Sequence, residues 1–135
     1  MKKLFTLLLF IPFLGCNKET IQKNLVISAM TNGQWKVTKF MQGTTNATND
    51  FSDYKFQFKE NNSVDAIRVS NSAIEKSGAW SADPGARTIT SQFTNAASTL
   101  MLLNGTWRIT NNSWTFVEAT QNVSGIDHSL RLDKL

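Results

Sequence analysis

The feature that most constrains the fold of this chain is a glycine followed two residues later by a tryptophan. This pattern occurs at residues 33–35, 78–80 and 105–107. After the first copy, the apolar residues Trp35 and Val37 alternate with polar ones, and this period of two indicates a half-buried strand. We therefore expect residues 33–40 to form the first strand of a small antiparallel barrel, in which Trp35 plugs one end.

Eight stretches with strand character predict an all-β fold, an antiparallel up-and-down β-barrel or a strongly curved meander. They are residues 34–41, 54–59, 63–69, 73–81, 88–93, a strand marked by Trp107 and Ile109, a strand marked by Trp114, Phe116 and Glu118, and residues 129–134. The run 100–103 is apolar on consecutive positions and predicts a helical turn over the barrel mouth. Pairing of the last strand with the first would remove the exposed sheet edges.

The N-terminus predicts a segment that is removed. A basic start is followed by an apolar run, residues 4–14, which is about half the ~20 residues of a membrane-spanning helix. Gly15 and Cys16, the only cysteine, follow directly. This arrangement resembles the lipobox of bacterial lipoproteins, which implies a signal peptide over residues 1–15 and a lipid on Cys16. The alternative is an ordinary secretory signal that leaves an unmodified cysteine.

Residues 16–32 are expected to be a tether that ends in a short helix. Thr20 is a suitable N-cap, and Asn32 with Gly33 is a suitable C-terminal stop. The residues expected on its apolar face are Ile21, Leu25, Ile27 and Met30. Such a helix would either close one mouth of the barrel or pack only on the outer surface. The barrel itself is predicted to be one domain over residues 33–135.

From residue 33 onward the chain resembles the small lipocalin-like lipoproteins of Bacteroidota. The matching motifs are Gly33-x-Trp35-Lys36-Val37, Phe51-x-x-Tyr54-x-Phe56-x-Phe58, Ser63-Val64-x-Ala66, Gly78-x-Trp80-Ser81, Leu102-Leu103-Asn104-x-x-Trp107 and Leu130-x-Leu132-x-Lys134. The resemblance implies an antiparallel β-barrel and says little about a ligand. In the wider lipocalin family, an arginine near the last strand packs across the first tryptophan. Arg131 is the candidate for that role here, with Leu132 as a further neighbour of Trp35.

Catalytic or metal chemistry is not expected. His128 is the only histidine, and we expect an exposed loop residue rather than a catalytic base. Asp50 and Asp53 lack the clustered ligands of a calcium loop, so we expect them to cap turns. The chain has no motif for a cofactor or a metal. We therefore predict a protein that is not an enzyme and carries no cofactor.

Large aromatic side chains are the candidates for a ligand-lined interior or a packed core. They are Trp35, Tyr54, Phe56, Phe58, Trp80, Trp107 and Trp114. A barrel of about eight strands can hold packed side chains or one small ligand. Lys36, Lys39, Lys55 and Lys59 would form either a basic strip for an acidic glycan or lipid headgroup, or the solvated outer faces of two strands.

Two functions follow from these features. The first is a lipid-anchored envelope barrel that binds a small apolar or amphipathic ligand. The second is a non-enzymatic interaction or structural module with a filled barrel, which holds a partner protein or glycan through loops such as residues 43–50. The residue after Cys16 is Asn17 and not an aspartate, which favours anchoring in the outer membrane. The protein would then face either the periplasm or the cell surface.

The net charge gives little reason to expect a nucleic-acid partner. The formal charge of +4 includes Lys2 and Lys3, and without them twelve basic residues face ten acidic ones. So small an excess does not indicate nucleic-acid binding. We expect a monomer that meets the membrane only through its N-terminal acyl chains.

Overall fold

The computed structural model describes residues 18–135, with side-chain positions from Leu25 onward. The predicted signal peptide and Cys16 lie outside the described residues. The elements are α1 (Lys18–Thr31), β1 (Trp35–Gln42), β2 (Thr45–Asn46), the 3₁₀ turn η1 (Thr48–Phe51), β3 (Tyr54–Phe58), β4 (Ser63–Arg68), β5 (Ile74–Asp83), β6 (Thr88–Gln92), α2 (Ser98–Met101), β7 (Gly105–Asn112), β8 (Phe116–Val123) and β9 (Ile126–Lys134).

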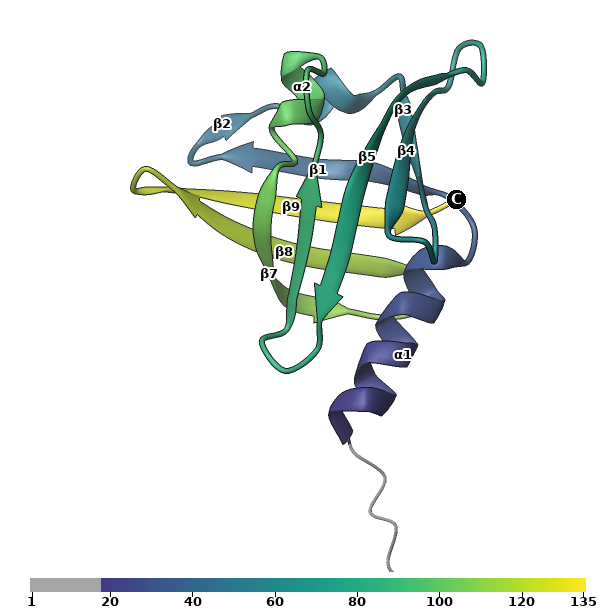
Figure 1. The fold of residues 1–135 in the computed structure, drawn as a ribbon. Coiled ribbons are helices and arrows are strands. Elements are labelled where there is room, and N and C mark those ends of the chain that lie inside the picture. The colour runs from purple at the N-terminus through teal and green to yellow at the C-terminus, as the bar shows by residue number, and fades with distance from the viewer. Residues whose placement is uncertain (1–17) are drawn as a thin grey trace, which may run out of the picture.

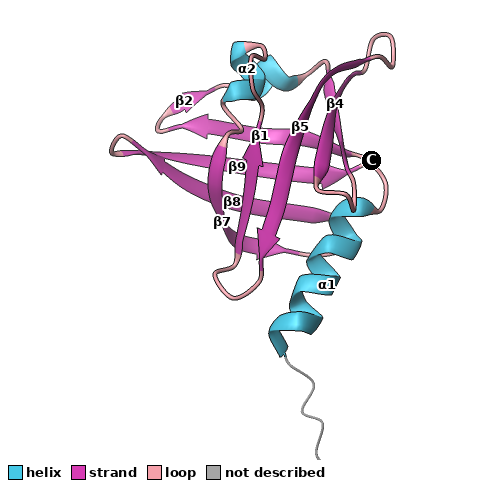
Figure 2. Cartoon of the chain, in the orientation of Figure 1, coloured by secondary structure: helices cyan, strands magenta, loops and turns pink. Residues whose placement is uncertain are grey.

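The strands form a closed antiparallel barrel, as the sequence predicts (Figures 1 and 2). From β3 to β9, each strand pairs with the next along the chain, and β1 pairs with both β3 and β9. The β1–β9 register runs from Trp35 opposite Lys134 to Gln42 opposite His128. Eight strands close the barrel, and the short β2 forms a hairpin with the end of β1 in a region expected to be a loop. The positive φ of Gly43, +60°, allows this tight turn.

Three tryptophans occupy the core, each with its indole N–H bonded to a backbone carbonyl. Trp35 Nε1 donates to the Met30 carbonyl, Trp80 Nε1 to the Lys59 carbonyl, and Trp107 Nε1 to the Leu103 carbonyl, each at 2.9 Å. A buried indole N–H without a partner would destabilise the fold, so each bond permits full burial of a large ring. The repeated glycine–tryptophan pattern therefore marks three places where a strand is joined to a neighbouring segment.

The helix α1 covers one mouth of the barrel with its last turn. Met30 is fully buried in the core and Ala29 is buried beside it, so the first of the two predicted placements is confirmed. The expected apolar face is wrong at Leu25, which is 60% exposed. The partly buried Val26 packs against the core instead, because the helix meets the barrel only near its C-terminal end (Figure 1). The side chains of Thr20 and Ile21 lie outside the described positions.

The opposite region of the barrel carries α2, close to the predicted helical turn over residues 100–103. Leu100 is fully buried and Leu103 is nearly so, whereas Met101 is exposed. Asn104 joins this turn to β6, because its side chain accepts from the Phe93 N–H at 2.6 Å and donates to the Phe93 carbonyl at 2.9 Å. Consecutive apolar residues thus indicate a helical cover rather than a strand.

The alternation in β3 generates a stability prediction. Phe56 is 1% exposed and Gln57 lies on the outer face. Phe56→Ala should lower the free energy of unfolding by about 3–5 kcal/mol, because it leaves a large cavity. Gln57→Ala is the matched control and should change that free energy by at most about 0.5 kcal/mol. Urea denaturation measures both, and equal losses would contradict the assigned facing of this strand.

Candidate functional site

The interior of the barrel is filled by side chains. Six of the seven predicted aromatic residues are buried there, namely Trp35, Tyr54, Phe56, Phe58, Trp80 and Trp107. The remaining cavity measures about 40 Å³ and is lined by apolar side chains apart from Ser91. Pockets that bind small molecules are about 300–1,000 Å³. These aromatic residues therefore form a packed core, and the space among them is far too small for an organic ligand.

Trp114, the seventh aromatic residue, lies outside the barrel and is 49% exposed. The predicted facing of this strand is wrong. Val117 and Ala119 are the residues of β8 that point inward, and Phe116 faces outward. Inward and outward residues alternate along β8 as expected, but the aromatic residues are on the outward side. There the cationic side chains of Arg131 and Lys134 cover the rings of Phe116 and Trp114.

The cation that lies over Trp35 is Lys134. Its Nζ is 5.1 Å from the centroid of the Trp35 ring and 4.3 Å from the centroid of Trp114. This nitrogen is buried without a hydrogen-bond partner among the described residues, and burial lowers the pKa of Lys134. Two aromatic faces therefore replace water around this ammonium group.

Arg131 does not fill the place that the lipocalin resemblance implies. Its guanidinium lies 4.4 Å from the ring centroid of Phe116 on the outer surface. It forms ion pairs with Glu118 at 2.7 Å and with Asp133 at 2.9 Å. Leu132 is buried in the core opposite Val37, whereas Lys134 is the residue opposite Trp35. The expected contact between Arg131 and Trp35 is therefore wrong, because Arg131 alternates with the inward Leu132.

The two aspartates expected to cap turns lie in different surroundings. Asp53 accepts hydrogen bonds from the Ser70 backbone N–H at 2.8 Å and from its hydroxyl at 3.0 Å. These bonds, the backbone one first, lower the pKa of Asp53, and Arg68 also lies 3.3 Å away. Asp50 is exposed in η1. The expectation of turn capping is confirmed for Asp53.

Tyr54, at the edge of the core, contacts the same Arg68 that lies beside Asp53. Its hydroxyl donates to Glu75, and the guanidinium of Arg68 lies 4.5 Å from the ring centroid. Burial, together with the bond to Glu75, raises the pKa of Tyr54 to about 12. The hydroxyl is thus a structural donor that ties β3 to β5.

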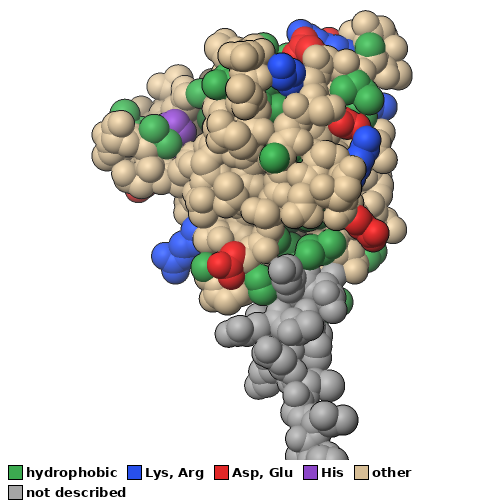
Figure 3. All heavy atoms as spheres, in the orientation of Figure 1, with side chains coloured by type: hydrophobic (Ala, Val, Ile, Leu, Met, Phe, Trp, Pro, Cys, Tyr) green, Lys and Arg blue, Asp and Glu red, His purple; other side chains and the backbone are tan. Residues whose placement is uncertain are grey.

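The four lysines of the predicted basic strip do not act as one free patch. Lys59 pairs with the buried Asp65 at 2.7 Å, and Ser77 donates to the same carboxylate at 2.7 Å. The pKa of Asp65 is lowered, since these bonds outweigh the desolvation that would raise it. On the face drawn in Figure 3, side chains of both signs are dispersed among neutral ones.

His128 is buried in β9 and is 8% exposed, so the expectation of an exposed loop histidine is wrong. The strand begins at Ile126, three residues earlier than predicted. The ring of His128 meets that of Phe40 edge-on, with 6.1 Å between the centroids. Its Nδ1 is enclosed without a hydrogen-bond partner among residues 18–135, and such a group is rare in native proteins.

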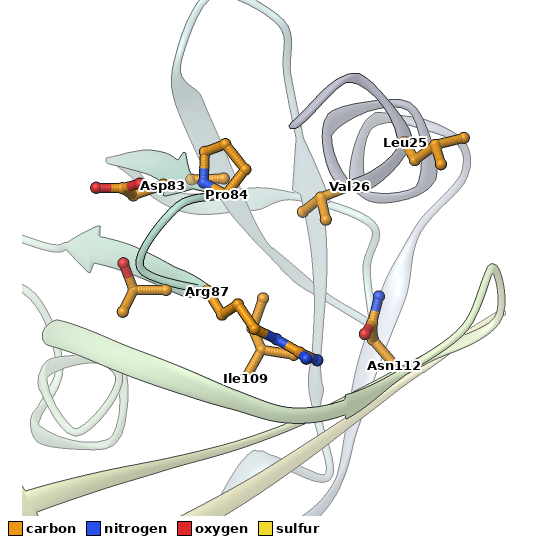
Figure 4. Close-up of a pocket in the computed structure, with 9 residues that line it drawn as sticks. Leu25, Val26, Asp83, Pro84, Arg87, Ile109 and Asn112 are labelled. Carbon is orange, nitrogen blue, oxygen red and sulfur yellow. The ribbon is translucent and has the colours of Figure 1, made fainter. Parts of the chain in front are cut away.

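The first surface groove lies between α1 and the turn that joins β5 to β6. It measures about 260 Å³, and its apolar residues are Leu25, Val26, Ala82, Pro84 and Ile109. Figure 4 shows the Arg87 side chain passing Ile109 toward Asn112, with Leu25 and Val26 on the opposite wall.

The second groove, here called the outer polar groove, lies over β6–β9 and the β1–β2 turn. It measures about 580 Å³, and its lining residues are polar apart from Gly43. They include Thr88, Arg108, Thr120, Gln121, His128 and Ser129. This volume is within the range of ligand sites, in contrast to the barrel interior.

The described part of the chain offers no metal site. No group of three or more histidine, cysteine, aspartate or glutamate side chains in this part could hold a metal ion. None of the helices in the same part is long and apolar enough to span a membrane.

The contact between Lys134 and Trp35 generates a prediction, with Arg131 as the comparison. A double-mutant cycle of Trp35→Phe with Lys134→Met should give a coupling energy above about 0.5 kcal/mol, because these side chains are in direct contact. The matched cycle of Trp35→Phe with Arg131→Met should be additive within about 0.5 kcal/mol. Denaturant unfolding of the single and double variants measures both cycles. Coupling to Arg131 and not to Lys134 would contradict the assignment.

Comparisons with known proteins support the fold alone. No family model matches the chain, and no curated protein does. Among solved structures, the chain is similar to a DUF4847 family protein from Bacteroides vulgatus, with a TM-score of 0.55 and 14% sequence identity. The match covers 80% of this chain and 96% of that one. The chain therefore shares its barrel fold with a protein from Bacteroides.

Proposed function

We propose that this protein is a non-enzymatic, lipid-anchored module of the bacterial cell envelope, which binds its partner on the outside of a filled barrel. The observation that carries the proposal is the interior volume of about 40 Å³. A ligand inside would require an expansion to about 300 Å³ or more, and fully buried rings such as Phe56 and Phe93 would have to move. Of the two functions predicted from the sequence, the interaction module fits this core better.

The N-terminal sequence supports the anchoring part of the proposal. Cys16 ends the apolar run and lies two residues before the first residue of α1. Two or more acyl chains at this position would hold the protein stably at a membrane, which a single chain does not. Asn17 favours the outer membrane, and the barrel then stands beyond α1 as a rigid platform.

A test of the filled interior uses protein purified natively from its own host. Native mass spectrometry should give the mass of the polypeptide plus its acyl chains, because the core has no room for more. Solvent extraction of the same sample should release no stoichiometric small molecule. A stoichiometric apolar compound in the extract, matched by the same extra mass in the native spectrum, would contradict the proposal and restore the ligand-binding function.

A test of anchoring examines the mass of the N-terminal peptide. The wild-type peptide should begin at Cys16 and carry acyl chains, and Cys16→Ser should remove them and release the protein from membranes. The double variant Cys16→Ser/Ser28→Cys is the matched control, since it returns a thiol to an exposed position on α1. Acylation of that control, or an unmodified wild-type peptide, would refute the anchor.

A further inference from the structure

We propose that the outer polar groove binds a neutral saccharide chain. This inference rests on the proposed function, because it places binding outside the barrel, and it adds the site and the class of ligand. The groove measures about 580 Å³ and is lined by polar residues and Gly43. It lies over β7, β8 and β9, which run side by side before the β8–β9 hairpin extends past the barrel (Figure 1).

The strand register builds a continuous polar row across the floor of this groove. Thr88 on β6 is opposite Arg108 on β7, Arg108 is opposite Thr120 on β8, and Thr120 is opposite Ser129 on β9. Side chains directly opposite in neighbouring antiparallel strands lie about 4.5–5.5 Å apart at Cβ. Three hydroxyls and one guanidinium therefore stand in line, perpendicular to the strands.

These groups are available for a ligand. Among the described residues, no side-chain hydrogen bond is formed by Arg108, Thr120 or Ser129, and Arg108 has no ion pair. At the hairpin, Asp127 accepts from the Asn122 amide at 2.9 Å and retains further acceptor capacity. Gln121 donates to the Asn104 carbonyl at 3.1 Å, which leaves its own carbonyl oxygen as an acceptor.

His128 lies at the edge of this groove but packs inward against Phe40. It is 8% exposed and shares the inward facing of Leu130, whereas Ser129 between them faces outward. A ligand on the outer row therefore meets Arg108, Thr120 and Ser129, and not the enclosed Nδ1 of His128.

The chemistry of the groove favours a saccharide over other ligands. No apolar side chain lines it, which disfavours an acyl chain or the apolar centre of a protein interface. The lining contains one guanidinium, that of Arg108, and one carboxylate, that of Asp127, so the groove lacks the several cations that bind a phosphate chain. Hydroxyls, amides and one charge of each sign match a ligand that presents many neutral hydroxyl groups.

The experiment titrates the ¹⁵N-labelled full chain with neutral hexasaccharides of glucose, mannose and xylose, and separately with inorganic phosphate. Amide shifts should respond to at least one hexasaccharide and cluster on β6–β9 near Arg108, Thr120 and Ser129. Shifts caused by phosphate alone would overturn the proposal, and so would the absence of any response to the hexasaccharides.

Four variants distinguish a binding role from a structural one. Arg108→Gln and Thr120→Val should each weaken saccharide binding by about tenfold, the effect of losing a charged or well-placed hydrogen bond. His128→Phe keeps a ring against Phe40 and leaves the outer row intact, so it should bind as the wild type does. Arg87→Gln, in the groove beside α1, is the matched control and should bind as the wild type does.

The outcomes separate this inference from the proposed function. A saccharide that shifts core residues such as Phe56, and not the outer row, would overturn both, because binding would then be internal. Failure of every hexasaccharide to bind, with an empty interior by mass spectrometry, would overturn the saccharide site alone and leave a protein partner for the outer surface. Equal weakening by Arg87→Gln and Arg108→Gln would also overturn the site.

Discussion

The structure depends on the closure of the barrel around Trp35. This residue pairs with Phe56 on β3 and with Lys134 on β9, and its indole N–H donates to the end of α1. One residue thereby joins the first strand to the next barrel strand and the last strand through its backbone, and to the helix through its buried side chain. Because β9 pairs with β1, the barrel presents no long free edge for aggregation, and only the short β2 extends the sheet.

Filling of the interior determines where function can lie. The inward residues of the eight barrel strands form the core, which leaves the outward residues and the hairpins for the partner contact proposed above. The same alternation that buries Ile89, Trp107, Ala119 and Leu130 sets Thr88, Arg108, Thr120 and Ser129 on the outside. In the function proposed above, the barrel is a platform and these outward residues form its recognition surface.

The sequence predicts the barrel better than it predicts the surface. Strand β3 shows a clear period of two and was predicted with its facing, whereas β4 is buried on both faces, and Asp65 and Ile67 obscure its pattern. The facing of β8 could not be read from its aromatic residues, because Trp114 and Phe116 are covered by cations from β9, a long-range contact. The outer polar groove has no motif, since it depends on register across four strands, yet the excess of threonine and asparagine is consistent with it.

A crystal structure of the protein purified from its own host decides whether the barrel is filled and whether binding is external. A filled barrel requires continuous side-chain density among Phe56, Phe93, Leu103 and Trp107, with no ordered molecule between them. External binding requires that any molecule retained through purification lies against the outer faces of β6–β9. An elongated ligand enclosed by these four side chains, with Phe56 or Phe93 displaced to admit it, would show instead that binding is internal.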